Sequence, residues 1–322
     1  MKKGLVTVFG GSGFVGRYVV RALARDGWRV RVAMRQPHTG QELRVMGNVG
    51  QIQLVQANVR FKQSVERAVE GADAVINLVA VLYEEGRQSF EGLHVNGANN
   101  VAEAAASAGI TNFVQVSAIG ADKDSDIDYA RTKALGEAAV RAAVPSADIM
   151  RPSIIFGAED GFFNRFAKMA TMPGGLALPL LGGGNTKFQP VYVGDVADAI
   201  AKVIGQGTTA TTYELGGPRV YSFKELMQFL LKSIDRKRLL LPVPWIGANA
   251  LGFVGEMTGA LPFVPPFLTR DQVRNLKIDN VVADDATGFD ALGLQLETIE
   301  SIVPEYLEKY RKYGQFYEKS VS

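Results

Sequence analysis

The sequence predicts an α/β protein with a doubly wound parallel sheet and a smaller, mainly helical C-terminal lobe. Two observations lead to this fold class. In the first half of the 322-residue chain, short apolar runs alternate with stretches of helical periodicity, as in successive βαβ units. The first apolar run is also followed by glycines three residues apart, a turn typical of the first strand-to-helix connection in such folds.

The expected elements follow one another regularly as far as Pro152. Beyond it the chain is less regular and richer in Gly and Pro, until residues 186–205 resume a strand-then-helix pattern. We therefore assign 1–152 to a nucleotide-binding domain to which 186–205 returns, and 153–322 to a C-terminal substrate-type or docking lobe. The expected strands are 5–10, 29–34, 52–57, 74–80, 112–118 and 147–153, and the expected helices are 14–25, 62–70, 88–107 and 129–143.

Composition excludes several classes of function. The net charge is +2 and the pI near 8.6, so there is no broad basic field and nucleic acid is not an expected partner. Cysteine is absent, which removes disulfides, thiolate metal sites and a cysteine nucleophile. Only two histidines occur, His38 and His94, so no metal site is expected.

The start of the chain, MKKGLVTVFGG, is interpreted as a first strand rather than a signal or transit peptide. No apolar run of about 20 residues is available to span a bilayer. The nearest is 245–268, which is interrupted by Glu256 and by Pro262, Pro265 and Pro266. It is either a core helix with a proline-rich loop or a surface that touches lipid or an apolar partner.

A glycine turn follows the first expected strand. Gly10, Gly13 and Gly16 form G-x-x-G-x-x-G between a strand and a helix, the context that a dinucleotide fingerprint requires. Glycines let the backbone approach a pyrophosphate, and the helix N-terminus presents N–H groups to it. Arg35 ends the second strand, where an acidic residue would favour NADH. A guanidinium pairs with phosphate instead, which predicts NADPH, with Arg17 as a second cation.

Other strand ends complete the expected cofactor site. Asn58 follows the third strand and is placed to bind the adenine edge, whereas Leu78 and Val79 would run beneath the pyrophosphate and ribose. Metal ligands are not expected. The expected cofactor contacts are Gly10, Ser12, Gly13, Phe14, Val15, Gly16, Arg35, Asn58, Val59, Leu78, Val79, Ser117, Tyr129, Lys133 and Pro152.

Three of these residues have the pattern of a catalytic set. Tyr129 and Lys133 are four residues apart on one helix face, and Ser117 leaves the preceding strand. An ammonium near the phenol favours the phenolate, so we expect Lys133 to lower the pKa of Tyr129 and allow it to exchange a proton with a substrate oxygen. Ser117 would hold that oxygen, and Lys133 would also bind the nicotinamide ribose.

A basic cluster precedes the apolar segment of the C-terminal lobe. Arg236, Lys237 and Arg238 stand directly before LLLPVPWIGANALGFVG. This arrangement fits either contact with lipid headgroups or a helix end with ordinary solvated charges.

The glycine turn, Ser117, Tyr129, Lys133 and MRPSIIFG resemble the extended and atypical short-chain dehydrogenase/reductases, a Rossmann-type superfamily. Over essentially the whole chain, further segments are similar to a narrower family, the nucleotide-binding accessory subunit of respiratory complex I in its alphaproteobacterial form. These segments are NLVAVLYEEGRQSFEGLHVNGANNVAEAA, FQPVYVGDVADAIA, FLTRDQVRNLKIDNVV and PEYLEKYRKYGQF.

The resemblance implies a function different from that of an ordinary dehydrogenase. Members of this family are peripheral, non-catalytic subunits of the proton-pumping NADH:quinone oxidoreductase, near the junction of its peripheral and membrane arms, and they hold a tightly bound structural NADPH. It also implies other complex I subunits as partners, on the cytoplasmic side of the bacterial inner membrane. The basic cluster before the apolar segment makes membrane lipid a candidate partner of the C-terminal lobe. Gly10, Gly13 and Gly16 would then hold the pyrophosphate, Arg35 the 2′-phosphate, and Tyr129 and Lys133 the nicotinamide ribose.

Two alternatives remain. Because Ser117, Tyr129 and Lys133 are all present, the chain also fits a freestanding NADPH-dependent reductase or epimerase of the extended short-chain type. In the complex I interpretation the same three residues are vestigial and serve only to bind the cofactor. An NADPH-sensing regulatory protein is a third possibility, without a sequence feature of its own.

Overall fold

The computed structural model describes residues 3–172, 177–259 and 269–316. The chain divides into two compact units, each made of three segments. The first unit comprises Met1–Pro152, Val193–Leu215 and Val282–Gln295, and the second comprises Ser153–Tyr192, Gly216–Val281 and Leu296–Ser322. The expected return at 186–205 thus differs in its bounds, because β10 (Val191–Tyr192) pairs with β7 (Ile155–Phe156) of the second unit.

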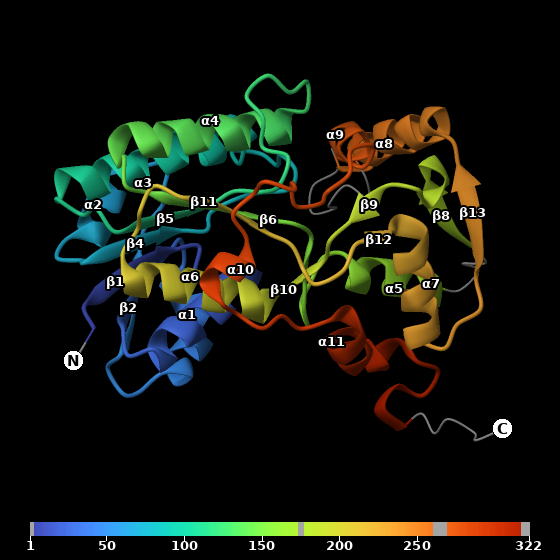
Figure 1. Cartoon of the computed structure of the whole chain (residues 1–322), viewed down its shortest axis with the longest axis horizontal. Coiled ribbons are helices and arrows are strands. Elements are labelled where there is room, and N and C mark those ends of the chain that lie inside the picture. The colour runs from blue at the N-terminus through green and yellow to red at the C-terminus, as the bar shows by residue number, and fades with distance from the viewer. Residues whose placement is uncertain (1–2, 173–176, 260–268, 317–322) are drawn as a thin grey trace. The chain divides into compact units, whose positions relative to one another are not determined.

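The first unit contains one seven-stranded parallel sheet in the order β11-β6-β5-β4-β1-β2-β3 (Figure 1). The predicted doubly wound parallel sheet is confirmed. Val6, Val30 and Ile76, in three of its strands, are completely buried, as expected where helices cover both faces. The strands are β1 (Leu5–Phe9), β2 (Arg29–Met34), β3 (Ile52–Gln56), β4 (Ala74–Asn77), β5 (Phe113–Val116), β6 (Asp148–Pro152) and β11 (Thr212–Leu215).

Helices cover the two faces of this sheet. Figure 1 shows α1 (Phe14–Arg25) and α6 (Val193–Gln206) on one face, and α2 (Lys62–Val69), α3 (Asn96–Ser107) and α4 (Asp128–Ala143) on the other. A 3-10 segment, η1 (Pro37–Met46), follows β2, and a short helix, α10 (Phe289–Leu292), packs on α6 and β11.

The helix predicted at 88–107 is interrupted. A π-helical segment, η2 (Glu91–Val95), precedes α3. At this point α4 approaches closely, since a Cβ atom on Gly136 would lie only 2.1 Å from the carbonyl oxygen of His94. Such π segments are frequent at functional sites, and His94, which lies in this segment, faces the candidate site described below.

The second unit has three two-stranded sheets around an aromatic core. The pairs are β7 with β10, β9 (Lys187–Phe188) with β12 (Tyr221–Ser222), and β8 (Ala177–Leu181) with β13 (Leu239–Val243). Phe156, Phe163, Phe188 and Phe223 are nearly inaccessible and contact one another or their aromatic neighbours. The helical segments are α5 (Phe163–Thr171), η3 (Gly182–Gly184), α7 (Phe223–Ser233), α8 (Trp245–Gly259), α9 (Arg270–Asn275), α11 (Ile299–Tyr306), η4 (Glu308–Tyr310) and η5 (Gly314–Phe316).

Segment 245–268 is helical up to Gly259, and 260–268, with its three prolines, lies outside the described residues. The core-helix interpretation holds only in part: Ala248 is fully buried, but Ile246 is 86% and Phe253 50% exposed. Within the described ranges, no helix is both long enough and apolar enough to cross a bilayer.

Candidate dinucleotide site in the first unit

The expected site residues gather at one edge of the sheet. Gly10, Arg35, Leu78 and Ser117 each directly follow a strand, namely β1, β2, β4 and β5. These strands are parallel neighbours, so their carboxyl ends meet at the same edge. Ligands of open α/β sheets bind at this edge, near the point where the strand order reverses, here between β1 and β4.

The glycine turn is built for close backbone packing. Gly10 has φ +79°, and its carbonyl oxygen accepts a hydrogen bond from the Gly13 N–H at 3.0 Å. A Cβ on Gly16 would lie 2.3 Å from that same oxygen, so only glycine fits there. Gly13 is the N-cap of α1 and no side chain caps the helix, which leaves the N–H groups of its first turn available to an anion.

Arg35 lies exposed beyond β2, as an anion-binding cation should. Its Nη1 donates to Oε1 of Gln88 at 3.0 Å, a neutral partner, so its positive charge is not neutralised by this contact. Arg17 is turned back on the glycine turn, where its Nη1 donates to the Ser12 carbonyl at 2.8 Å. Arg17 therefore braces the turn.

On the adenine side of the expected site, several groups already form hydrogen bonds or pack within the chain. Oδ1 of Asn58 accepts the Arg60 N–H at 3.1 Å. Val59 is 6% exposed and belongs to the core of the first unit, and its carbonyl accepts the Asn100 amide at 2.8 Å. The Asn58 backbone is also used, because its N–H donates to the Ser64 hydroxyl at 3.0 Å and its carbonyl accepts from that hydroxyl at 2.9 Å. The side-chain amide nitrogen of Asn58 thus remains for a base edge.

A buried amide pair missed by the sequence analysis supports Leu78 and Val79. Nδ2 of Asn77 donates to Oε1 of Gln115 at 2.9 Å, and its Oδ1 accepts the Val79 N–H at 3.2 Å. Both amides are almost fully buried. They join β4 to β5 where the chain leaves the sheet and so set the path of the segment that carries Val79.

Ser117 is the residue whose hydrogen bonding most clearly indicates a ligand-binding role. Its side chain is 5% exposed, and its Oγ has no hydrogen-bond partner among the described residues. Buried hydroxyls are normally paired, so an orphan at the end of β5 indicates a polar group supplied from outside the chain. Pro152, at the end of β6, is buried, and its carbonyl accepts the Ile119 N–H at 3.1 Å.

Tyr129 and Lys133 lie in the first two turns of α4, but the expected electrostatic effect is wrong. Burial raises the pKa of Tyr129 to about 12 rather than lowering it. Burial also lowers the pKa of Lys133 to about 8, against the opposing effect of Glu137. The Lys133 Nζ donates to the Val116 carbonyl at 3.0 Å. Since both groups lose water, the phenol is a neutral hydrogen-bond donor at pH 7 and not a phenolate.

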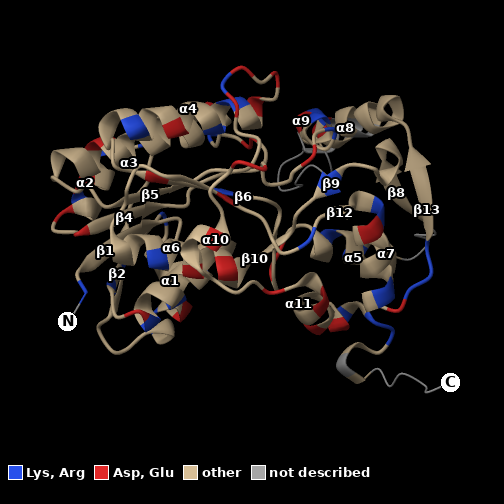
Figure 2. Ribbon diagram, in the orientation of Figure 1, with Lys and Arg blue, Asp and Glu red and all other residues tan. Residues whose placement is uncertain are grey.

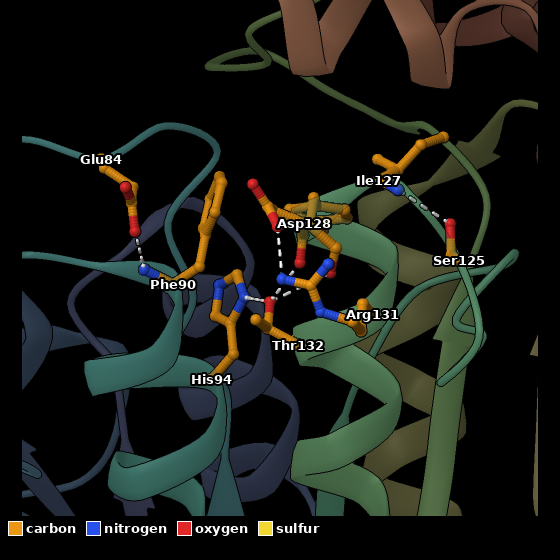
Figure 3. Close-up of polar contacts among 9 residues, drawn as sticks. Glu84, Phe90, His94, Ser125, Ile127, Asp128, Arg131 and Thr132 are labelled. Carbon is orange, nitrogen blue, oxygen red and sulfur yellow. Dashed lines mark hydrogen bonds and ion pairs between the residues drawn. The ribbon is translucent and has the colours of Figure 1, made fainter.

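His94 is a further site residue, and no sequence pattern indicates it. Its Nδ1 lies 3.1 Å from Oγ1 of Thr132, as Figure 3 shows, and the Val81 N–H donates to its Nε2 at 3.2 Å. The Thr132 hydroxyl donates to the Asp128 carbonyl at 2.7 Å and so accepts from His94. His94 is therefore neutral with the proton on Nδ1, and burial, together with the Lys133 charge, lowers its pKa to about 3.

This histidine links the two halves of the candidate site. Its ring stacks on Phe90 at 5.2 Å and meets the Tyr129 ring edge-on at 5.5 Å. It thereby connects the segment after β4 to the first turn of α4. A lone histidine in an apolar stretch has no pattern of its own, and only contacts over 38 residues reveal its role.

The residues present fit a nicotinamide dinucleotide. The glycine turn and the uncapped α1 suit a pyrophosphate, Arg35 suits an additional phosphate, and the orphan Ser117 hydroxyl suits a polar group at the far end of the site.

Comparisons with known proteins agree with this geometry. Residues 6–216 match the NAD dependent epimerase/dehydratase family. Among solved structures, a dTDP-glucose 4,6-dehydratase from Streptomyces venezuelae with NAD bound has a TM-score of 0.72 at 20% identity, covering 98% of this chain and 99% of that one. An NADPH-dependent quinone oxidoreductase of Escherichia coli, complexed with NADPH, has the same TM-score at 19% identity, covering 94% and 99%. At this identity the two structures show the fold alone.

Relatives of higher sequence identity assign the chain to a narrower family. "NADH dehydrogenase (ubiquinone) 1 alpha subcomplex subunit 9" of Arabidopsis thaliana is 36% identical, with 99% of this chain and 81% of that protein covered. The "NADH-ubiquinone oxidoreductase 40 kDa subunit" of Neurospora crassa is 32% identical, covering 95% and 79%. A "ceramide reductase" of Caulobacter vibrioides is 30% identical, covering 85% and 84%. The chain therefore belongs to the NAD dependent epimerase/dehydratase family and, within it, to the family of these NADH dehydrogenase alpha subcomplex subunits.

Proposed function

We propose that this chain is a non-catalytic accessory subunit of a proton-pumping NADH:quinone oxidoreductase, complex I, in which it holds a structural NADPH. The observation that carries the proposal is the relationship to complex I subunits of a plant and a fungus over 99% and 95% of this chain. Its partners are other complex I subunits. It lies peripherally on the cytoplasmic side of a bacterial inner membrane and stabilises the junction of the two arms.

The proposal gives each part of the site a task. The Ser12 N–H before the helix and the first-turn N–H groups of α1 at Phe14 and Val15 bind the pyrophosphate over the three glycines. Arg35 pairs with the 2′-phosphate, which selects NADPH over NADH. The remaining contacts flank the adenosine and nicotinamide halves, with Asn58, Val59, Leu78 and Val79 on the former and Ser117, Tyr129, Lys133 and Pro152 on the latter.

A held cofactor is consistent with the electrostatics of the nicotinamide side. When bound, NADPH supplies a hydride donor, and the Tyr129 phenol keeps its proton because burial raises its pKa to about 12. Tyr129, Ser117 and Lys133 then act as hydrogen-bond donors to the cofactor. A ligand bound only by the folded chain stabilises it by about 4 kcal/mol at a thousandfold excess over Kd.

The nucleotide that copurifies with the chain tests whether NADPH is its cofactor. We expect the purified chain to release NADPH on acid-free heat denaturation, and Arg35→Glu to carry at least tenfold less, with any residual dinucleotide shifted towards NADH. The control is Arg29→Glu, at the opposite end of the same strand and about 20 Å away at ~3.3 Å per residue. Equal NADPH content in the two variants would remove Arg35 from the site.

Native electrophoresis of solubilised membranes tests whether the chain is assembled into complex I. After solubilisation in mild detergent, we expect the chain to comigrate with the large band that stains for NADH dehydrogenase activity on native electrophoresis. A chain found only in the soluble fraction would contradict the assignment to complex I.

A freestanding NADPH-dependent reductase or epimerase is the second candidate. It is favoured by the ceramide reductase relative and by the complete Ser117, Tyr129 and Lys133 set. Tyr129→Phe separates the two. In complex I, NADH-to-quinone turnover should stay within about twofold of the parent, whereas a reductase would lose roughly a hundredfold or more of its NADPH oxidation without its proton donor.

A further inference from the structure

A groove in the second unit has no part in the nucleotide site. It lies between the C-terminal half of α7 and the start of β13, is open to solvent and has a volume of about 660 Å³. Its walls come from a single stretch of about a dozen residues, and they are formed by Gln228, Leu231, Arg236, Lys237, Arg238, Leu239 and Leu240.

The walls of the groove are of two kinds. Leu231, Leu239 and Leu240 form an apolar surface, and Leu239 is 66% exposed. Three consecutive cations form the rim, within the basic segment that is coloured blue where it enters β13 in Figure 2. An apolar slot beside a cationic rim is complementary to a molecule with an anionic head and a hydrocarbon tail.

Among the described residues, no acidic side chain forms an ion pair with these three cations, and Arg238 is held by a backbone carbonyl. Nε of Arg238 donates to the Ala170 carbonyl at 2.8 Å, which leaves its positive charge in place. Nε of Arg236 is shielded from solvent and has no partner among the described residues. Asp235, the nearest acid in the chain, has φ +50° at the turn, and the Arg236 N–H closes this turn on the Leu231 carbonyl.

An exposed apolar side chain continues along β13 beyond the groove. Leu241 of this strand is 51% exposed. Between Lys232 and Arg238 the chain carries four cations and one anion. Apolar residues next to a local excess of positive charge are typical of surfaces that rest on anionic bilayers.

We propose that this groove binds an acidic phospholipid at a membrane surface. Arg236, Lys237 and Arg238 contact the headgroup phosphate, while Leu231, Leu239 and Leu240 line one acyl chain. A protein partner is the less favoured occupant, because three consecutive cations beside leucines are complementary to an anionic head and a hydrocarbon tail in one molecule. The site goes beyond the proposed function, since it needs neither the nucleotide nor complex I.

Vesicle cosedimentation of the full chain tests the site. We expect binding to vesicles of phosphatidylcholine with a third phosphatidylglycerol, and at least tenfold weaker binding to phosphatidylcholine alone. Raising the salt from 0.1 M to 0.5 M should weaken the binding, because the rim cations are accessible to screening. Equal binding to both vesicles, or binding to neither, would overturn the proposal.

Two triple variants that remove the same charge at different positions test whether the groove is the part of the chain that contacts the membrane. Each cation near an anionic bilayer contributes about fivefold, so Arg236→Gln/Lys237→Gln/Arg238→Gln should weaken binding roughly a hundredfold. Lys168→Gln/Lys187→Gln/Lys224→Gln removes the same charge from exposed positions elsewhere in the second unit and should bind like the parent. If the two triple variants bind equally, net charge alone is responsible and the proposal fails.

A further pair of measurements identifies the occupant. Leu239→Gln/Leu241→Gln should weaken vesicle binding about tenfold and keep its preference for phosphatidylglycerol. Unchanged thermal unfolding and nucleotide content would show that both groove variants are folded. Binding of oleate with no binding to vesicles would instead assign the groove to free fatty acids and overturn the membrane contact.

Discussion

The two units of this chain are held together in different ways. The first is one sheet of seven parallel strands, in which a ladder of backbone hydrogen bonds joins segments from Leu5 to Leu215. In the part that the structure describes, the second has only two-stranded pairs, two of them just two residues long, and depends on packing among phenylalanines. Backbone ladders leave a clear periodic pattern in a sequence, whereas an aromatic cluster assembled from distant segments does not.

The units also differ in their polar groups. The first buries Asn77, His94, Ser117 and Lys133 along one edge of its sheet, where a ligand would use them. The second has a mainly apolar core and displays its cations on the outside, next to exposed leucines. One unit is therefore suited to enclosing a polar cofactor, and the other to resting against a surface.

The largest effect should come from the aromatic core. Phe163 is fully buried between Phe156, Phe162 and Phe229, so Phe163→Ala should lower the free energy of unfolding by about 4 kcal/mol. Urea unfolding measures this loss. Nucleotide content at 4 °C should not change, and Phe253→Ala, at a half-exposed position, is the control. Loss of nucleotide together with stability would show that the two units do not separate energetically.

The buried ammonium should make the nucleotide-free protein pH-dependent. Lys133 titrates near pH 8 when folded and at 10.5 when unfolded, so between these values the unfolded state binds more protons and stability rises with pH. The gain amounts to about 3 kcal/mol over this window. Lys133→Met should remove it and be the more stable form at pH 7, unlike Lys123→Met at an exposed loop position. A parallel pH profile for parent and Lys133→Met would contradict the burial argument.

In the glycine turn, substitution by alanine should be damaging at Gly16 and tolerated at Gly13. In Gly16→Ala the new Cβ would press on the Gly10 carbonyl and on the Gly11 backbone at 2.3–2.6 Å, which we expect to cost about 2 kcal/mol and to abolish nucleotide retention. Gly13→Ala meets only the Gly10 carbonyl, at 3.3 Å, and should retain at least half of the nucleotide. Thermal unfolding and nucleotide content check both variants, and a parent-like nucleotide content in Gly16→Ala would mean that the turn does not hold the cofactor.

The smallest effect should come from the His94 link. Thr132→Val leaves the Nδ1–H of His94 without its acceptor, at a cost of about 1 kcal/mol. Because His94 orients Val81 and Tyr129, NADPH should dissociate about fivefold faster, and Thr132→Ser should restore the parent rate. Stopped-flow displacement measures the rates. A rate unchanged in Thr132→Val would confine His94 to a packing role.

Much of the first unit could be predicted because its signals are local. The bounds of α1 and β2 were predicted to the residue, and Gly10, Gly13, Gly16 and Arg35 follow from spacing relative to predicted strands. Apolar alternation, helical periodicity and a glycine turn depend on neighbours within a few residues, so the sequence by itself determined the sheet and the edge at which its ligand-binding residues gather.

Only the tertiary structure decided the remaining features. It joined Val282–Gln295 to the first unit, made His94 a bridge to Thr132, and formed the groove beside Leu239. It also reversed the expected direction of the Tyr129 pKa, because the helical spacing of Lys133 indicates proximity but not the loss of water around both groups. Burial and contacts between distant segments are properties of the folded chain as a whole, and no local pattern encodes them.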